Sequence, residues 1–570
     1  MRLRFVPLLA AVLLAACART PSLAQPAPLP PPTLETGMVS AADPRAAAAG
    51  IEILRQGGSA TDAALATLLA LTVVEPQSSG IGGGGFLVHG DPRGAVTSYD
   101  GRETAPMAAT GTWFFKDGQP LSFDEAIPGG KSVGVPGNVR LMALAHRDLG
   151  RVHWRTLFAP AIKLARDGFA ITPRLHRALG RYRETGALSL EARGLFYGAN
   201  GNPLPVGTIV RNRALAALFE RLATTGPDAF YVGPNAQAIV AAVNAAPRNP
   251  SAMTAGDLAA YDAKPRPAVC GTYRAHRICG MGPPSSGATT VLAILKQLER
   301  FDLAALGPAS PAAWHLFAES TRLAFADRDR FLADPDFQPV PVAGLIDPGY
   351  LAARSALIAP DRAIANIAPG NPVGAPRVTA GLTPAENGTS HFVAADRFGN
   401  IASLTSTIES AFGSGLMVNG YYLNNELTDL SLVPERDGRP VANRVEPGKR
   451  PRSSMAPTIV YGPDGRPRLA VGAAGGATII VQVAKAIIGV IDWRLSAQQA
   501  IALPVVYAPG DTLFVERGTS LEAMIPALRA LGHPIVEPRE PSFKANAIEF
   551  VAGRRIGAAD PRSEGVALGD

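Results

Sequence analysis

The hydrophobic pattern of the chain begins with two helices in close succession. Helix-forming alanines follow Pro44, and the stretch ends at Gln56 before two glycines, which predicts a first helix there. Ser59-Ala-Thr-Asp62 then has the spacing of a capping box, so a second helix is expected over 63–74. Because this second segment is apolar on almost every side, we expect it to be buried.

Further helical patterns recur through the first half of the chain, at 139–147, 154–167, 212–224, 236–244 and 289–300. Alternating or β-rich runs gather later, at 390–395, 401–407, 458–461 and 468–471. Helices early and strands late predict an α/β fold in which helices are layered around sheets.

A glycine run, Gly80-Ile-Gly-Gly-Gly-Gly85, precedes a strand-like segment at 86–89. Such runs bind phosphate groups when a lysine and a serine or threonine follow and a helix begins. This run has neither residue and leads into a strand, which argues against a nucleotide site.

Composition narrows the class of protein. The 570 residues are 47% apolar and 18% charged, which excludes a wholly disordered chain and allows either several domains or one large layered core. The net charge of +7 comes from scattered lysines and arginines without a basic run, so a solvated basic surface is favoured over a nucleic-acid partner.

The N-terminus is typical of a bacterial export signal. Positive charge at Met1–Arg4 precedes the apolar stretch Phe5–Ala16, and Leu14-Ala-Ala-Cys17 resembles a lipobox in which Cys17 would be lipidated. Cleavage by an ordinary signal peptidase near Ala24 is the alternative. We therefore expect a periplasmic protein or one anchored to the outer membrane.

A tether and then the fold should follow this signal. Residues 18–36 are rich in proline and alanine, which favours an extended segment, and the folded part should begin near Gly37. No later apolar run approaches the roughly 18 to 20 residues that a spanning helix needs, so membrane contact is expected only through the lipid.

Two cysteines remain besides Cys17. Cys270 and Cys279 flank a segment with β-branched and aromatic residues around a plausible reversal, so a hairpin could bring their sulfurs together in an oxidising compartment. Two reduced, buried thiols are the alternative. Neither these thiols nor the eight histidines show the spacing of a metal site.

The segment Glu386-Asn-Gly-Thr-Ser-His-Phe-Val-Ala-Ala-Asp396 contains the most informative threonine of the chain. Taken alone, Thr389 follows a turn-like Asn-Gly and is most simply a residue at the start of a strand. Spacing by itself does not distinguish this from a catalytic role.

What changes the interpretation is an ordered series of segments. Together they resemble gamma-glutamyltranspeptidases from Gly37 to Ser563. They are Gly37–Ser40, Gly57–Ala64, Gly82–Gly85, Gly101–Pro106, Gly134–Gly137, Pro283–Gly287, Ala326–Arg328, Gly388–His391, Asn424–Asn425, Lys449–Met455, Gly475–Gly476 and Asp560–Ser563.

The resemblance implies the four-layered αββα sandwich of N-terminal-nucleophile hydrolases. It also implies a precursor that cuts its own Gly388-Thr389 bond, leaving a large subunit (37–388) and a small subunit (389–570) associated as a heterodimer. The new α-amino group, with an unperturbed pKa of about 7.7 to 8, can then serve as the general base for the threonine hydroxyl.

The site residues carry over from the same resemblance. Thr389 corresponds to the nucleophile, Thr407 to the threonine that supports it, and Gly475 with Gly476 to the backbone donors of an oxyanion hole. The predicted substrate-binding residues are Arg102, Ser453 and Ser454 for an α-carboxylate, and Glu409, Glu426 and Asp429 for an α-ammonium.

Two departures from the family pattern stand out. Glu409 occupies a position where the family commonly has asparagine, so three acids would share one pocket, and crowding should raise a carboxyl pKa. The stretch from Asp429 to Lys449 is shorter than in members with a lid and lacks a tyrosine that could close the pocket, so longer substrates or acceptors should enter.

The function expected from the resemblance is hydrolysis or transfer of γ-glutamyl groups from glutathione and related compounds, without a metal or organic cofactor. A cephalosporin or glutaryl acylase of the same fold is the first alternative, and the acids at the ammonium position argue against it. An unprocessed, non-enzymatic surface lipoprotein is the second.

Overall fold

The structure is a computed structural model, and it describes Met1 and residues 37–381, 388–541 and 543–570. The helices and strands given below belong to the compact unit Thr33–Asp570. The predicted signal, Cys17, the tether and Asn387 lie outside the described residues. None of the described helices is long and apolar enough to span a bilayer.

Two sheets form the centre of this unit. The first is seven-stranded, in the order β24-β1-β11-β12-β2-β3-β8, and the second is six-stranded, in the order β23-β22-β18-β17-β10-β9. Their strands are β1 (Met38–Ala41), β2 (Gly84–Gly90), β3 (Val96–Gly101), β8 (Lys264–Arg266), β9 (Val269–Tyr273), β10 (His276–Gly280), β11 (Ser390–Ala395), β12 (Ile401–Thr407), β17 (Thr458–Tyr461), β18 (Pro467–Ala474), β22 (Lys544–Val551), β23 (Arg554–Ala559) and β24 (Val566–Gly569).

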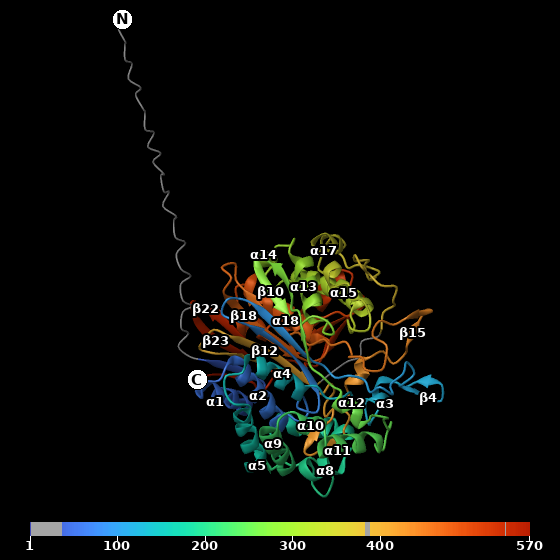
Figure 1. Cartoon of the computed structure of the whole chain (residues 1–570). Coiled ribbons are helices and arrows are strands. Elements are labelled where there is room, and N and C mark those ends of the chain that lie inside the picture. Colours follow the sequence, from blue (N-terminus) through green and yellow to red (C-terminus); the bar gives the residue numbers. More distant parts are fainter. Residues whose placement is uncertain (2–36, 382–387, 542) are drawn as a thin grey trace. The chain divides into compact units, whose positions relative to one another are not determined.

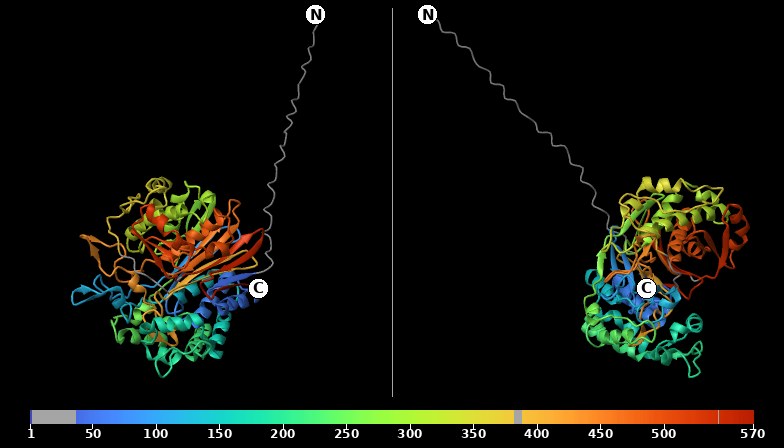
Figure 2. Two further views of the ribbon diagram at one scale, coloured as in Figure 1. Left: turned by 180° about the vertical axis from the view of Figure 1, so that it is seen from behind. Right: turned by 90° about the vertical axis from the view of Figure 1, so that its right-hand side faces the viewer.

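The sheets pack face to face, because β11 and β12 of the first contact β18 and β22 of the second. Helices cover both outer faces (Figures 1 and 2). Against the first sheet lie α1 (Pro44–Arg55), α2 (Ala60–Val74) and α4 (Asn138–Leu149); against the second lie α13 (Gly287–Leu298), α18 (Thr478–Ile491) and α19 (Ala497–Ala502). This arrangement confirms the predicted αββα sandwich.

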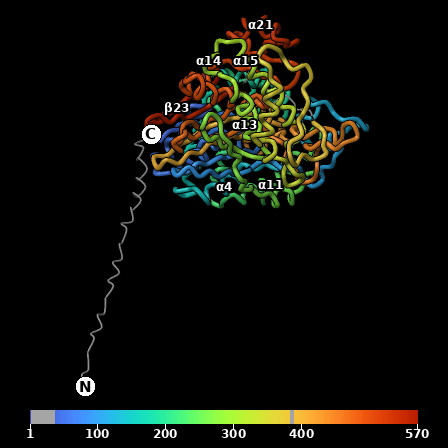
Figure 3. The backbone as a smooth tube through the Cα atoms, turned by 90° about the horizontal axis from the view of Figure 1, so that it is seen from above, coloured from blue at the N-terminus to red at the C-terminus, as the bar shows by residue number. Residues whose placement is uncertain are grey.

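Other helices extend the two outer layers. Seen from above, α13, α14 (Leu303–Leu306) and α15 (Pro311–Phe331) lie over the strands (Figure 3). The remaining helices are α3 (Phe123–Ala126), η1 (Trp154–Phe158), α5 (Ala159–Asp167), α6 (Pro173–Arg181), α7 (Arg183–Gly186), α8 (Leu190–Phe196), α9 (Arg213–Thr225), α10 (Asp228–Tyr231), α11 (Pro234–Asn244), α12 (Ala255–Ala259), α16 (Val342–Leu345), α17 (Pro348–Ser355), η2 (Glu426–Asp429), α20 (Ser520–Ala523) and α21 (Ile525–Ala530).

Short strands outside the central sheets form small hairpins and one three-stranded sheet. They are β4 (Phe115–Lys116) with β5 (Gln119–Pro120), β6 (Phe169–Ala170) with β7 (Ile209–Val210), β13 (Met417–Val418) with β14 (Tyr421–Tyr422), β15 (Glu435–Arg436) with β16 (Arg439–Pro440), and β19 (Val506–Tyr507) with β20 (Thr512–Glu516) and β21 (Ile535–Arg539).

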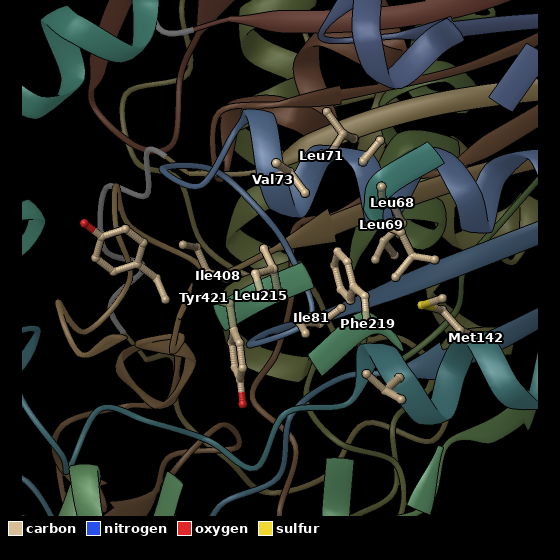
Figure 4. Close-up of a cluster of buried hydrophobic side chains, with 14 of the residues drawn as sticks. Leu68, Leu69, Leu71, Val73, Ile81, Met142, Leu215, Phe219, Ile408 and Tyr421 are labelled. Atoms are coloured by element: carbon tan, nitrogen blue, oxygen red, sulfur yellow. The ribbon is translucent and has the colours of Figure 1, made fainter. Parts of the chain in front are cut away.

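The second helix shows how the local sequence sets the core. The Ser59–Asp62 capping box forms as predicted, because the Ser59 side chain accepts from the Asp62 N–H and the Asp62 side chain accepts from the Ser59 N–H. All residues of α2 are buried, which confirms that the helix is enclosed on every side. Leu68, Leu69 and Leu71 belong to the apolar cluster of Figure 4, which reaches Ile408, the residue after Thr407.

The glycine run has a packing explanation. A Cβ on Gly83 would collide with the carbonyl of Thr407, and one on Gly82 with the carbonyl of Tyr422. Glycines at these positions therefore let the run pack directly against the backbone of Thr407 at the end of β12 and of Tyr422. This packing accounts for the glycine run without a phosphate ligand.

The two body cysteines face each other across a hairpin. Cys270 in β9 pairs directly with Cys279 in β10, and a disulfide joins their sulfurs. The two turn residues, Arg274 and Ala275, both have positive φ, as a two-residue hairpin turn of the favoured hand requires.

Candidate active site

The residues at the predicted cleavage point form a corner that we call the catalytic corner: Gly388, Thr389 and Thr407. The antiparallel pair β11–β12 places Ser390 opposite Ser406, so the residue before β11 meets the end of β12. Thr389 Oγ1 lies 3.2 Å from Thr407 Oγ1 and donates to the carbonyl of Gly388, and Thr407 Oγ1 lies 3.1 Å from the same carbonyl oxygen. Both threonines are buried.

The backbone of Glu409 holds this corner from the other side. Its N–H donates to Thr407 Oγ1 at 2.8 Å, and its carbonyl accepts from the Gly388 N–H at 2.6 Å. Because Thr407 Oγ1 accepts one bond, its own proton is available to the Gly388 carbonyl. Glu409 has a φ of 74°, a left-handed conformation that is unusual for a residue other than glycine, asparagine or aspartate.

The predicted oxyanion glycines lie at the same end of the sandwich. Gly472 in β18 packs against the ring of His391, two residues after Thr389. Lys544 pairs with Ala474, the residue before Gly475, and its Nζ donates to Oγ of Ser390, the residue after Thr389. The glycines and the threonine therefore lie at the same end of the two sheets. Gly475 and Gly476 have φ values of 120° and 60° and connect β18 to α18, a bend suited to glycine.

Arg102 forms ion pairs with Glu103, Glu426 and Asp429. Glu409 lies near enough to Asp429 and Glu426 for their charges to raise its pKa. We call these five residues the acidic cage. Arg102 Nη1 donates to Glu426 and Nη2 to Asp429. The five side chains are almost fully buried. The arginine and these two acids were expected to bind opposite ends of a substrate, whereas the structure pairs them with each other.

Arg102 is held firmly in this arrangement. Its Nε donates to the carbonyl of Pro451 at 3.1 Å and its Nη2 to the carbonyl of Arg452 at 3.1 Å. A substrate carboxylate would have to share or replace one of the carboxylates on the guanidinium fork.

Burial and mutual repulsion keep protons on the cage. Burial raises the pKa of Glu103 to about 7, partly offset by Arg102. Burial raises the pKa of Glu426 and of Glu409 well above the ordinary value, and for Glu409 the charges of Asp429 and Glu426 add to the rise.

Five carboxyl oxygens of the cage have no hydrogen-bond partner among the described residues. They are Oε1 of Glu409, Oδ1 of Asp429, Oε2 of Glu426 and both oxygens of Glu103. The other oxygen of Glu409 accepts from Asn425 Nδ2 and from Ser410 Oγ at 2.5 Å, so the side chain is fixed in place. Buried carboxylate oxygens without partners are costly, and a cationic group placed between them would lower that cost.

A second arginine positions one of the two predicted serines, and a backbone N–H holds the other. Ser454 Oγ accepts from Arg328 Nη2 at 2.6 Å, and Arg328 Nε donates to Ser286 Oγ at 2.9 Å. Ser453 Oγ accepts from the Met455 N–H at 3.1 Å. Each serine hydroxyl still has a proton to donate to an anionic ligand.

Asn424 connects the glycine run with the start of η2, where Glu426 of the acidic cage lies. Asn424 Nδ2 donates to the carbonyls of Gly82 and Gly134 at 2.8 and 2.9 Å, and Oδ1 accepts from the Gly134 and Glu426 N–H groups. This fully satisfied amide places the glycine run and the start of η2 beside each other.

Comparison with known proteins decides the family. The profile of the family described as Gamma-glutamyltranspeptidase matches residues 46–570. The chain belongs to the gamma-glutamyltranspeptidase family.

Relatives of this gamma-glutamyltranspeptidase family member carry two kinds of name. The glutathione hydrolase proenzyme of Bacillus subtilis (strain 168) is 36% identical over 94% of this chain and 91% of its own length. The acylase ACY 1 proenzyme of Pseudomonas sp. (strain V22) is 35% identical over 94% of both chains. The structure of cephalosporin acylase from Bacillus halodurans superposes with a TM-score of 0.82 at 25% identity, covering 97% of this chain and 99% of that one.

The stretch from Asp429 to Lys449, which the sequence predicts to be too short for a lid, contains a short hairpin. Residues 435–440 form β15 and β16, and Thr379 N donates to the Pro440 carbonyl at 3.1 Å beside them. This hairpin and the β4–β5 hairpin project on the same side (Figures 1 and 2). Whether longer substrates enter here stays a prediction.

Several contributing residues had no predicted role. Arg328 belonged to a recognised segment, but nothing in Ala-Asp-Arg indicates that it holds Ser454. Glu103 follows Arg102 directly and could have been included from that motif alone. The buried pair of Glu75 and Lys544, separated by 469 positions, had no sequence signal.

Proposed function

We propose that the chain is a self-processing γ-glutamyl hydrolase or transferase with Thr389 as its nucleophile. The observation that carries the proposal is the geometry of the catalytic corner. The hydroxyls of Thr389 and Thr407 both donate to the carbonyl oxygen of Gly388, the residue at the predicted cleavage point. Membership of the family supports it.

Self-cleavage begins with attack of Thr389 Oγ1 on the Gly388 carbonyl carbon. The hydroxyl proton passes to the Thr389 nitrogen as the C–N bond breaks, which leaves a Gly388–Thr389 ester and a free amine. Water then hydrolyses the ester to a Gly388 carboxylate and the Thr389 hydroxyl. Thr407, held by the Glu409 N–H, stabilises the negative charge on the carbonyl oxygen during attack.

Turnover uses the same hydroxyl on a γ-amide. The freed Thr389 amine accepts the hydroxyl proton, Oγ1 attacks the γ-carbonyl, and the proton leaves with the departing amine. The backbone N–H groups of Gly475 and Gly476 receive the oxyanion. Water or an amino group then takes the γ-glutamyl group from the ester, giving hydrolysis or transfer.

The acidic cage favours a substrate with an α-ammonium. Oε1 of Glu409 and Oδ1 of Asp429 are buried acceptors that a cationic group would satisfy. Glutathione and other γ-glutamyl compounds carry such a group beside an α-carboxylate, for which Ser453, Ser454 and Arg102 supply donors.

An acylase is the second candidate, because two of the relatives named above are acylases. A glutaryl group has no α-ammonium and would bring a further negative charge into the cage. The experiment that decides is release of chromophore from a γ-glutamyl anilide and from a glutaryl anilide by processed protein. Faster turnover of the glutaryl anilide would replace the first candidate by the second.

We also propose that the chain is exported and lipidated at Cys17, on the basis of its N-terminal sequence. Incorporation of labelled palmitate into the wild type but not into Cys17→Ser tests this. Labelling of neither protein would favour ordinary signal cleavage near Ala24.

A further inference from the structure

A buried group of side chains beside the nucleophile has no part in the mechanism above. We call it the Lys544 cluster: Lys544, Glu75, Ser78 and Ser390. Lys544 Nζ donates to Glu75 Oε2 at 2.8 Å and to the hydroxyl oxygens of Ser78 and Ser390 at 3.2 Å each. Ser390 Oγ also donates to Glu75 Oε2 at 2.7 Å. All four side chains are almost fully buried.

The cluster joins elements that lie far apart in the sequence. Glu75 caps the C-terminus of α2, Ser390 is the first residue of β11, and Lys544 is the first residue of β22. Ser390 directly follows Thr389. On the other side, β22 pairs with β18 so that Lys544 lies opposite Ala474, the residue before Gly475.

Lys544 therefore contacts both halves of the predicted reaction centre. Its side chain donates to Ser390, the first residue of β11. Its backbone belongs to β22, which pairs with β18 up to Ala474, the residue before Gly475. An ammonium has three protons, and three acceptors receive them here. A side chain saturated in this way is fixed in one rotamer, as the support of a reacting group requires.

The ion pair between Lys544 and Glu75 means that replacing either residue should lower the stability of the protein. A buried charge that loses its partner is strongly destabilising. Without Lys544, the Glu75 carboxylate would keep the Ser390 hydroxyl as a donor and Arg174, whose Nε lies 3.7 Å from Glu75 Oε1, as its cationic partner among the described residues. The cluster thus holds Ser390 by charge as well as by packing.

We propose that Lys544 is a positioning residue that sets Thr389 against the Gly475–Gly476 pair, acting through Ser390 Oγ on one side and the Ala474 pairing on the other. The proposal rests on the proposed function, since it takes Thr389 as the nucleophile and the two glycines as oxyanion donors.

Charge on Lys544 links this positioning to pH. Burial lowers the pKa of Lys544 to about 8, Arg174 lowers it further, and the charges of Glu75 and Asp43 oppose the decrease. Above that pH the ammonium becomes an amine with one donor fewer, and the contact with Ser390 weakens. Turnover should therefore decline on the alkaline side.

The test uses a matched pair of hydroxyl deletions. Ser390→Ala and Ser78→Ala each remove one 3.2 Å contact of the same ammonium. Only Ser390 lies on the nucleophile strand, and Ser390→Ala also removes the 2.7 Å bond to Glu75. Ser390→Ala should slow self-cleavage and lower kcat for a γ-glutamyl anilide about tenfold or more with little change in KM, whereas Ser78→Ala should change each rate less than about twofold. Equal effects of the two substitutions would overturn the proposal.

A second measurement separates positioning from stability. In a Lys544→Met background, Ser390→Ala should no longer lower kcat, because the lysine transmits the effect, and the alkaline decline near pH 8 should be absent. Additive losses in the double variant, or an unchanged alkaline limb, would contradict the proposal. If Lys544→Met does not fold, the matched serine pair and the wild-type pH profile still decide.

Failure of the proposed function is recognised separately. Wild-type protein that neither cuts itself at Thr389 nor turns over a γ-glutamyl anilide would refute the proposed function and this inference with it. Active wild type with indistinguishable serine variants would refute this inference alone.

Discussion

The catalytic corner and the acidic cage are neighbours built from different kinds of groups. The corner consists of two hydroxyls and backbone amides, all neutral, and its geometry follows from the pairing of β11 with β12. The cage consists of four acids around one arginine, several of them with raised pKa values. Glu409 belongs to both, through its backbone in the corner and its carboxyl in the cage.

Because the corner is neutral and the cage is charged, self-cleavage and turnover should differ in how strongly they depend on charge. Self-cleavage uses only the neutral corner, so it should tolerate changes in the cage and vary little with cage protonation. Turnover needs a charged ligand to enter the cage, so it should respond to both.

Thr389→Ala should abolish self-cleavage and turnover, since it removes the hydroxyl on which both steps depend. We expect one intact chain and a loss of at least about a thousandfold in kcat. Wild-type protein should give a small chain of about 19 kDa, in proportion to the 59.2 kDa of 570 residues, and N-terminal sequencing should begin at Thr389. A different N-terminus would refute the assignment.

Arg102→Lys should impair turnover, which depends on the acidic cage, and leave self-cleavage, which depends on the catalytic corner, intact. The change keeps the charge but removes the planar fork that bonds Glu426 and Asp429, so kcat/KM for a γ-glutamyl anilide should fall about a hundredfold while self-cleavage proceeds normally. The exposed Arg177→Lys is the control. Unchanged kinetics in Arg102→Lys would exclude Arg102 as the carboxylate clamp.

Glu409→Gln tests the residue shared by both regions. Loss of the carboxylate weakens the bond to a substrate ammonium, and we expect kcat/KM for the γ-glutamyl anilide to fall about tenfold with self-cleavage retained. The glutaryl anilide and Glu409→Asn, which suits the left-handed backbone, are the controls. An equal response of both anilides across pH would show that Glu409 does not face the ammonium.

Glu103→Gln should flatten the dependence of stability on pH. The folded-state pKa of Glu103 is raised from 4.5 to about 7, so the folded protein binds more protons than the unfolded one in that range and loses stability as pH rises through it. Because the pKa of the neighbouring Glu426 is also raised, Glu426 can bind a proton in place of Glu103, and we expect a change of order 1 kcal/mol, or about 1–2 °C in Tm. Thermal unfolding at pH 5 and pH 8 measures it; the same slope in variant and wild type would contradict the assignment.

Local patterns predicted the elements that have clear ends. The Ser59–Asp62 capping box and the strands 390–395 and 401–407 appear in the structure with those bounds. The longest helix, α15, was not predicted, because buried polar residues such as Glu319, Arg322 and Arg328 interrupt its apolar pattern. The expectation of helices early and strands late was incomplete, since β1, β2 and β3 join the same sheet as β11 and β12.

The candidate site could be assembled from the sequence only through the family resemblance. Periodicity does not reveal that Arg102 pairs with Glu426 and Asp429, because their contacts depend on how distant segments pack. For the same reason Lys544 had no sequence signal. Its role depends on a carboxylate and two hydroxyls supplied by three other segments.

The disulfide between Cys270 and Cys279 protects an edge strand of the second sheet from pairing with another chain. Strand β9 is an outermost strand of the six-stranded sheet, and such a strand offers backbone groups to which a foreign chain can add. The disulfide fastens β9 to its inner neighbour at directly opposed residues, so the edge cannot peel away and expose the next strand. Under reducing conditions this restraint is lost, and the first consequence should be self-association through β9 rather than loss of activity.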